Sequence, residues 1–116
     1  MVAGDTDKNK VTRDVFLAFV RVHVLYHAAK EPIFGVEMME ELGRHGYDIS
    51  PGTLYPLLHS LERGGVLVSR QETAGGRTRR YYRTTRRGDA LLRDLQAKIR
   101  ELAGEVLDAP LRRKPR

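Results

Sequence analysis

The hydrophobic and polar positions in the middle of the chain follow the repeat of a short α-helix. Four leucines recur at i, i+3, i+4 and i+7 and form one apolar stripe: Leu54, Leu57, Leu58 and Leu61. Ser50 is a good N-cap for this helix, and Pro51 suits its first position. Gly64 and Gly65 suit its end, because glycine adopts the left-handed conformation without a Cβ penalty. Pro56 removes one interior hydrogen bond, which predicts a kink or an irregular first turn.

Two further helices are predicted before this one. The first runs from Thr12, which can cap it, to about Lys30, and it is apolar on nearly every face. Such a helix needs cover on all sides, and in so small a chain we expect some of that cover to come from a second subunit. The second helix follows Pro32 and spans about Phe34–Arg44. Together with the leucine-striped helix it makes two short helices joined by a tight turn, which is a helix-turn-helix pattern.

The period of the pattern changes after Gly65. Val66–Glu72 is rich in β-forming residues, Thr73–Gly76 indicates a turn, and Arg79–Thr84 indicates the return strand of a hairpin. A hairpin after a helix-turn-helix predicts a winged helix. Thr85 or Thr84 can cap the last helix, which spans about Arg86–Asp108. Its apolar residues step by 3, 4, 3 and 4, the spacing of a coiled-coil seam: Leu92, Leu95, Ile99, Leu102 and Val106.

The predicted fold is therefore mainly α (α+β): a winged helix-turn-helix with a long C-terminal dimerisation helix. The 116 residues suffice for one domain with a modest core. We predict a disordered leader over residues 1–11, a DNA-binding domain over 12–85, a dimerisation helix over 86–108 and a basic tail over 109–116. The predicted dimer interface draws on the first and last helices: Phe16, Phe19, Leu92, Leu95, Ile99, Leu102 and Val106.

The composition of the chain limits which classes of protein and which binding partners are consistent with it. A net charge of +6 and a pI near 10.0 favour a polyanionic partner, either nucleic acid or an anionic membrane surface. The absence of cysteine excludes disulfides and thiolate metal sites and fits the cytoplasm. Met1–Lys10 is too polar for a secretory signal, and Val15–Ala29 is too short for a membrane span. We expect a cytoplasmic protein without a membrane partner.

Polar and cationic side chains outside the leucine stripe suit the reading of base edges and phosphates. On that helix alone, solvated side chains are the simpler interpretation. The wing changes this interpretation. Seven arginines lie in the hairpin and the start of the next helix, with Glu72 the only carboxylate among them, which predicts that the block has no intramolecular partner. Arginine runs are often just solvated faces, but beside a helix-turn-helix they favour phosphate contacts. The predicted DNA contacts are Ser50, Thr53, Tyr55, His59, Arg63, Arg77, Arg79 and Arg80.

The chain also resembles the PadR family of bacterial transcriptional regulators over roughly Val15–Leu95. The resemblance rests on Ser50–Leu58, on Leu61–Leu67 and on Gly75–Gly88, and the Gly-Thr-Leu-Tyr-Pro segment is its most specific part. It implies a winged helix, a homodimer built through the C-terminal helix, and repression that a small effector releases. The single C-terminal helix is similar to the short branch of the family.

The resemblance carries over to particular positions. Ser50, Thr53, Leu54, Tyr55 and Pro56 match the family's recognition-helix signature, and Gly75, Arg79, Tyr81 and Tyr82 match its wing. The chain departs from the family at Phe34–Met38, where His-Gly-Tyr-Glu-Leu/Ile is usual, and at Thr84, where Leu is usual.

The sequence contains candidate residues for two other kinds of site, a metal site and an effector pocket, and lacks the motifs of an enzyme. His23 and His27 lie four apart and could face one metal ion, but no third ligand is evident, so neither a metal nor a cofactor is expected. Phe16, Phe19 and Tyr26 could line an effector pocket, although aromatic stripes at helical spacing are more often core. An enzyme is not expected, because the chain lacks a cysteine nucleophile, a glycine-rich phosphate loop and a nucleophile elbow.

The sequence thus predicts a sequence-specific DNA-binding regulator, a repressor that binds an inverted-repeat operator as a homodimer. Its partners are double-stranded DNA, a second copy of the chain and, as an open question, a small-molecule effector. Two alternatives remain: a non-specific architectural DNA-binding protein, and a winged-helix adaptor whose basic wing binds an acidic protein.

Overall fold

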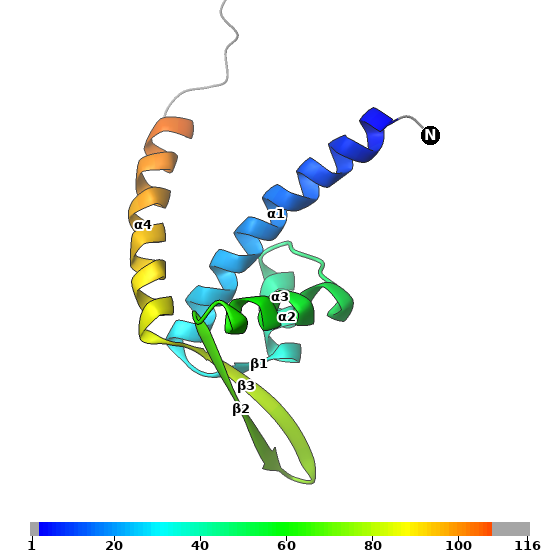
Figure 1. The fold of residues 1–116 in the computed structure, drawn as a ribbon, viewed down its shortest axis with the longest axis vertical. Helices are drawn as coiled ribbons and strands as arrows, with labels where there is room; N and C mark the ends of the chain where they lie inside the picture. The colour runs from blue at the N-terminus through cyan, green and yellow to red at the C-terminus, as the bar shows by residue number, and fades with distance from the viewer. Residues whose placement is uncertain (1–2, 108–116) are drawn as a thin grey trace, which may run out of the picture.

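The computed structural model describes residues 3–107 and has the architecture of a winged helix (Figure 1). Three helices come first: α1 (Ala3–Lys30), α2 (Gly35–Arg44) and α3 (Pro51–Arg63). The strands β1 (Ile33–Phe34), β2 (Leu67–Ala74) and β3 (Arg77–Thr84) form one small antiparallel sheet. The chain continues into α4 (Arg86–Val106). The predicted fold class is confirmed. The predicted basic tail, and Asp108 at the end of the predicted last helix, lie outside the described residues.

The first helix begins earlier than the sequence predicts. It is continuous from Ala3, so residues 3–11 are helical where a disordered leader was predicted. Thr12 is an interior residue and not the N-cap, since its hydroxyl donates to the Lys8 carbonyl one turn earlier at 3.1 Å. Lys10 and Asp14 form an i,i+4 ion pair at 2.8 Å that supports the same stretch. Local pairing of polar side chains therefore extends the helix beyond its apolar part.

A single core holds the helices and the sheet together. One face of α1, the leucine stripe of α3 and the inner face of the sheet meet there. The largest fully buried side chains are Val20, Val24, Leu25, Met38, Leu42, Leu54, Leu58, Leu67 and Tyr82. Burying side chains of this size is worth about 1.5–3 kcal/mol each, which fixes α3 on the sheet.

The sheet contains a strand that the sequence pattern did not reveal. β1 has two residues and pairs with the inner strand β3, with Ile33 opposite Tyr82 and Phe34 opposite Tyr81. Two residues are too few to show a period. The β2–β3 hairpin turns through Gly75 and Gly76, whose φ angles of 58° and 77° favour glycine.

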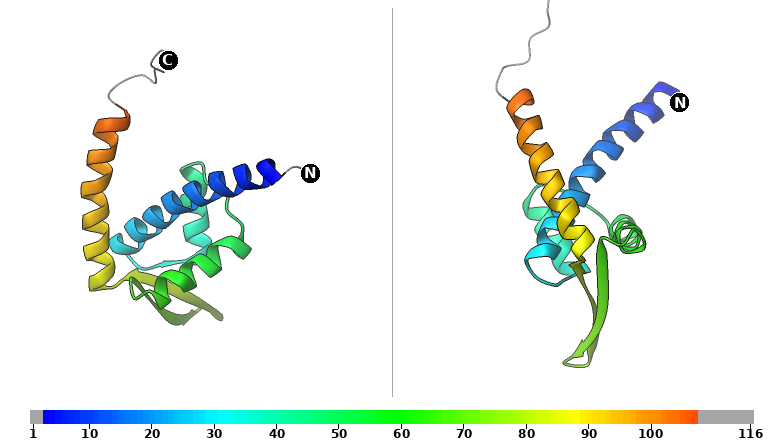
Figure 2. Two further views of the ribbon diagram at one scale, coloured as in Figure 1. Left: turned by 45° about the horizontal axis from the view of Figure 1, so that its top comes forward. Right: turned by 60° about the vertical axis from the view of Figure 1, so that its left-hand side comes forward.

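The start of α4 is fixed by contacts to the beginning of the wing. The Thr85 hydroxyl accepts from the Gly88 N–H at 3.0 Å, which confirms the predicted cap. A Cβ at Gly88 would overlap the carbonyl group of Val66, so the helix can pass this close to the backbone only with glycine there. From that point α4 extends away from the wing and diverges from the N-terminal half of α1 (Figures 1 and 2).

Candidate nucleic-acid interface

Of the four DNA contacts predicted within α3, two side chains are exposed and two are half-buried. His59 and Arg63 are exposed, whereas Thr53 and Tyr55 are half-buried on opposite flanks of the helix. The Tyr55 ring packs against the start of α2, where a Cβ on Gly35 would lie 2.7 Å from ring carbons. Glycine at position 35 therefore makes room for Tyr55, and the tyrosine ring is held by packing.

The beginning of α3 differs from the prediction in how it is capped. Ser50 stands at the N-cap, but its hydroxyl donates to the Thr53 hydroxyl at 3.3 Å, and the side chain makes no capping hydrogen bond to the backbone. Thr53 N–H and Leu54 N–H both donate to the Ser50 carbonyl, at 3.0 and 2.9 Å, a shared hydrogen bond that is common at helix ends. The helix nevertheless continues through Pro56 to Arg63.

A cationic residue from α1 joins this end of the recognition helix. The Arg13 guanidinium donates to the Thr53 hydroxyl at 3.4 Å, across 40 positions of sequence. Arg13 also lines a groove of about 440 Å³ beside Ser50 and Thr53. Sequence reasoning missed this arginine, because nothing local in the pattern of the first helix connects it to α3.

The wing arginines are less free than the sequence suggested. Arg70 pairs with Glu72 at 2.6 Å, and the Arg79 guanidinium lies 4.4 Å above the ring of Phe34. Arg80 donates to the Ser69 hydroxyl at 3.0 Å. The prediction that this block has no intramolecular partner is therefore wrong for these three arginines. All three nevertheless remain exposed, and a stacked guanidinium keeps its charge and its outward donors.

A chain of hydrogen bonds ties the wing to the recognition helix. Glu62 of α3 accepts from the Ser69 N–H at 2.9 Å and from the Ser69 hydroxyl at 2.8 Å. The Ser69 oxygen in turn accepts from Arg80. Charge-assisted hydrogen bonds of this kind are stronger than neutral ones, so the hairpin and α3 are fixed relative to each other. The sequence gives no sign of this link, because Glu62 resembles any solvated helical glutamate.

The recognition helix and the wing meet around one groove of about 590 Å³. Tyr55 lines it from α3, and Phe34, Gly35, Val36 and Glu40 line it from the start of α2. The wing contributes Arg77, Thr78, Arg79 and Arg80. Three guanidinium groups beside an aromatic side chain suit phosphates at the edge of a DNA groove.

The comparisons with known proteins agree with this geometry. Residues 24–94 match the model of the transcriptional regulator PadR-like family. The chain belongs to the PadR-like family. A transcriptional regulator of Mycobacterium tuberculosis is 50% identical over 95 residues, which cover 82% of this chain and 89% of that protein. A PadR family transcriptional regulator from Eggerthella lenta has a similar structure, with a TM-score of 0.72 and 32% identity over 93% of this chain and 98% of that one.

A PadR-like regulator from Bacillus cereus shares the fold at 22% identity, with a TM-score of 0.71 over 84% of this chain and 99% of that one. The resemblance noted in the sequence is thereby confirmed, and the protein is a transcriptional regulator with a winged-helix fold. Among residues 3–107, none of its helices combines the length and the apolar character needed to cross a membrane.

The predicted dimer residues of this PadR-like chain are mostly exposed in the single subunit. Leu92 is buried in the core and Leu95 packs on it, but Ile99 and Leu102 are 45% and 50% exposed. On α1, Phe16 and Phe19 are 54% and 48% exposed. A run of large apolar side chains at this exposure is typical of a surface that a partner covers.

A mostly apolar groove of about 530 Å³ lies between α1 and α4. Phe19 and Tyr26 line it, together with Leu95, Ile99 and Leu102 from α4. Phe16 lies apart and lines the groove beside α3 instead. The structure thus brings together two of the three aromatic residues considered for an effector pocket, and it places them beside the predicted seam.

Three histidines gather at one edge of that groove. The ligand atoms of His23, His27 and His45 all lie within 4.8 Å of one another. His45 ends α2, so it comes from the turn that leads to the recognition helix. Burial lowers the pKa of His23 below its usual value, and the neighbouring His45 and His27 lower it further. Burial also lowers the pKa of His27, against the opposing effect of Glu41.

These lowered pKa values predict a loss of stability in mild acid. The unfolded chain titrates near the ordinary histidine value of 6.5. As the pH falls below that value toward the folded-state pKa values, the unfolded chain takes up protons first, so the free energy of unfolding decreases. Thermal unfolding should give a lower Tm at about pH 5.5 than at about pH 7.5. His45→Asn removes a nearby charge and should reduce this difference, whereas His59→Asn should not. Equal effects of the two variants would contradict the prediction.

Proposed function

We propose that the protein is a sequence-specific DNA-binding repressor that acts in the bacterial cytoplasm. In this proposal α3 contacts the bases of an operator, and the wing contacts the flanking phosphates. The observation that carries this proposal is the groove in which Tyr55 of α3 and the wing residues Arg77, Arg79 and Arg80 line one space. The Glu62–Ser69–Arg80 link supports it further, because a wing held rigidly to the recognition helix loses little entropy when both bind.

The protein acts as a homodimer in this proposal. Pairing of the α4 seams would cover the exposed Ile99 and Leu102 and part of α1 together. A two-fold dimer that places its recognition helices about 34–36 Å apart, one turn of DNA, requires an inverted-repeat operator. A small apolar effector held between the subunits, where the groove between α1 and α4 meets the partner, would then alter this spacing and release the DNA.

The first test is footprinting on the DNA around the protein's own gene, followed by binding to the protected sequence and to random DNA of equal length. A specific regulator should bind the protected sequence at least about 1,000-fold more tightly at physiological salt. Equal binding to both would indicate an architectural protein. Binding to neither would favour an adaptor that uses the basic wing on an acidic partner.

A sharper test concerns Tyr55. Because its ring is half-buried against α2, Tyr55→Phe keeps the packing of the ring and removes only the hydroxyl, which lies beside Gly35. If the hydroxyl contacts a base, the operator affinity should fall by about 1–3 kcal/mol while the affinity for random DNA stays the same. Tyr26→Phe, on the exposed surface of α1, is the matched control and should change neither. Equal losses on operator and random DNA would show that Tyr55 only positions the helix.

A further inference from the structure

We propose that His23, His27 and His45 form a binding site for a divalent transition-metal ion, with Zn²⁺ the expected ion. His23 and His27 are four residues apart on α1, a spacing that puts two imidazoles on one helical face. His45 arrives from the end of α2. The sequence offered only the pair, and the fold supplies the third ligand within 4.8 Å of both.

The three imidazole rings lie close to one another. His23 stacks on His45 with ring centroids 4.7 Å apart and planes inclined by 24°, and His27 lies 5.8 Å from His45. Imidazole nitrogens are common ligands of divalent transition metals, and ligand atoms within 4.8 Å of one another can share one ion after small ring rotations.

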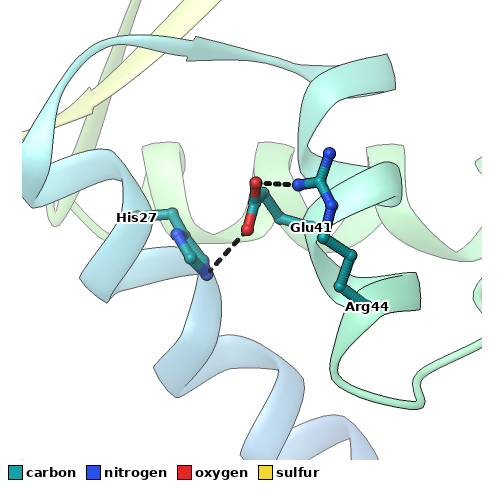
Figure 3. A network of polar contacts seen from close by, with 3 residues as sticks. All are labelled: His27, Glu41 and Arg44. Carbon is teal, nitrogen blue, oxygen red and sulfur yellow. Dashed lines mark hydrogen bonds and ion pairs between the residues drawn. The ribbon is translucent and has the colours of Figure 1, made fainter.

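The surroundings of His27 support a ligating role. Its Nε2 is buried and has no hydrogen-bond partner within the part of the chain that the structure describes. Oε2 of Glu41 lies 4.0 Å from it, and the other oxygen of Glu41 pairs with Arg44 (Figure 3). A carboxylate behind a ligating histidine commonly orients the ring and fixes its tautomer. Small ring rotations on metal binding would bring Nε2–H onto Glu41 and satisfy the buried nitrogen.

The three imidazole ligands determine which class of metal ion the site would bind. Three imidazole nitrogens suit zinc and its neighbours in the first transition row, whereas Mg²⁺ and Ca²⁺ prefer oxygen ligands. Tetrahedral Zn²⁺ with Zn–N bonds of about 2.0–2.1 Å needs nitrogens roughly 3.4 Å apart. The rings must therefore close in from their present spread, which the exposed His45 can do by rotation about its side-chain bonds. A water molecule or a small anion completes four-fold coordination.

Metal binding at this place would act on the recognition helix. The ion joins α1 to the turn between His45 and Ser50, the turn that positions α3. His23 and His45 also line the groove between α1 and α4, next to the predicted dimer seam. Binding of the ion would therefore couple the position of the recognition helix to the pairing of the subunits. In this way the ion regulates the affinity of the protein for DNA. This second step rests on the proposed function, whereas the site itself does not.

Zinc titration of the purified, untagged full-length chain tests the site. Calorimetry should show one Zn²⁺ per chain, and Co²⁺ should give the visible absorption of tetrahedral coordination. His45→Asn should weaken binding by at least about 10-fold, and Glu41→Gln by about 10–100-fold. His59→Asn is the matched control, because His59 is the one histidine of the chain outside the cluster, and it should bind Zn²⁺ like the parent. Absence of saturable binding, or equal weakening by His45→Asn and His59→Asn, would overturn the site.

DNA binding with added Zn²⁺ and with a chelator tests the regulatory step. The operator affinity of the parent should differ by at least about 5-fold between the two conditions, the lower end of typical allosteric coupling. The His45→Asn variant should show no difference. Identical parent affinities would overturn the coupling while the titration still decides the site. Failure to bind DNA in both conditions would instead contradict the proposed function.

Discussion

Replacing Ile99 and Leu102 with glutamate should convert the protein into a folded monomer with operator affinity lowered at least about 100-fold. Both side chains are about half exposed in the single subunit, so their loss costs the core little. In a dimer each glutamate would be buried at the seam without a cation, which costs several kcal/mol per charge. Without the second subunit, only one recognition helix engages each operator and the avidity of two half-sites is lost.

Sedimentation equilibrium and operator binding measure this result. The matched control is Ala90→Glu with Ala97→Glu, which adds the same charge to an exposed face of α4 away from the seam. The control should remain dimeric and bind the operator. Leu95 is unsuitable for this test because it packs on the core, so its loss would confuse unfolding with dissociation. A seam variant that stays dimeric and keeps its operator affinity would show that α4 does not form the interface.

Replacing Arg77 and Arg80 with alanine should weaken binding to every DNA sequence and flatten its salt dependence. Each phosphate contact contributes about 0.9 to the slope of log K against log salt, so two lost contacts remove about 1.8. At about 0.1 M salt this corresponds to a roughly 60-fold loss. Arg79 is kept in this variant because its guanidinium also packs on Phe34, and its removal would disturb the β1–β3 edge. Loss of Arg80 removes its hydrogen bond to Ser69 but leaves the hydrogen bonds of Ser69 to Glu62 in place.

Salt-titrated binding curves on operator and random DNA measure the slope. Arg93→Ala with Arg100→Ala removes the same charge from exposed positions of α4 and serves as control. The control should alter the affinity only slightly and leave the slope nearly unchanged. An unchanged slope in the wing variant would show that these arginines do not contact phosphate.

Much of the fold followed from the sequence because it depends on neighbours within one turn or one hairpin. The leucine stripe and the glycines after Arg63 predicted α3 to within a residue of its observed bounds. Thr85 predicted the start of α4, and the glycine pair at 75 and 76 lies at the hairpin turn. The helical residues 3–11 were missed because this polar stretch has no apolar period, and the polar contacts that support its later part, Lys10–Asp14 and Thr12–Lys8, are not visible in such a pattern.

The contacts between distant segments were decided only by the tertiary structure. Local sequence determines which face of an element is apolar, but not which side chains of another element meet it. The pairing of β1 with β3, Arg13 beside Thr53, and Ser69 on Glu62 each join positions whose patterns are independent.

The predicted DNA-contacting elements and the histidine cluster differ in the same way, as local and non-local arrangements. The family motif predicts that α3 and the wing contact DNA, and a motif can make this prediction because both are continuous segments. The histidine cluster was incomplete in the sequence because His45 lies 18 residues beyond His27, just after the end of α2. Packing of α2 against α1 brings their ligand atoms within 4.8 Å, a proximity that no periodicity encodes.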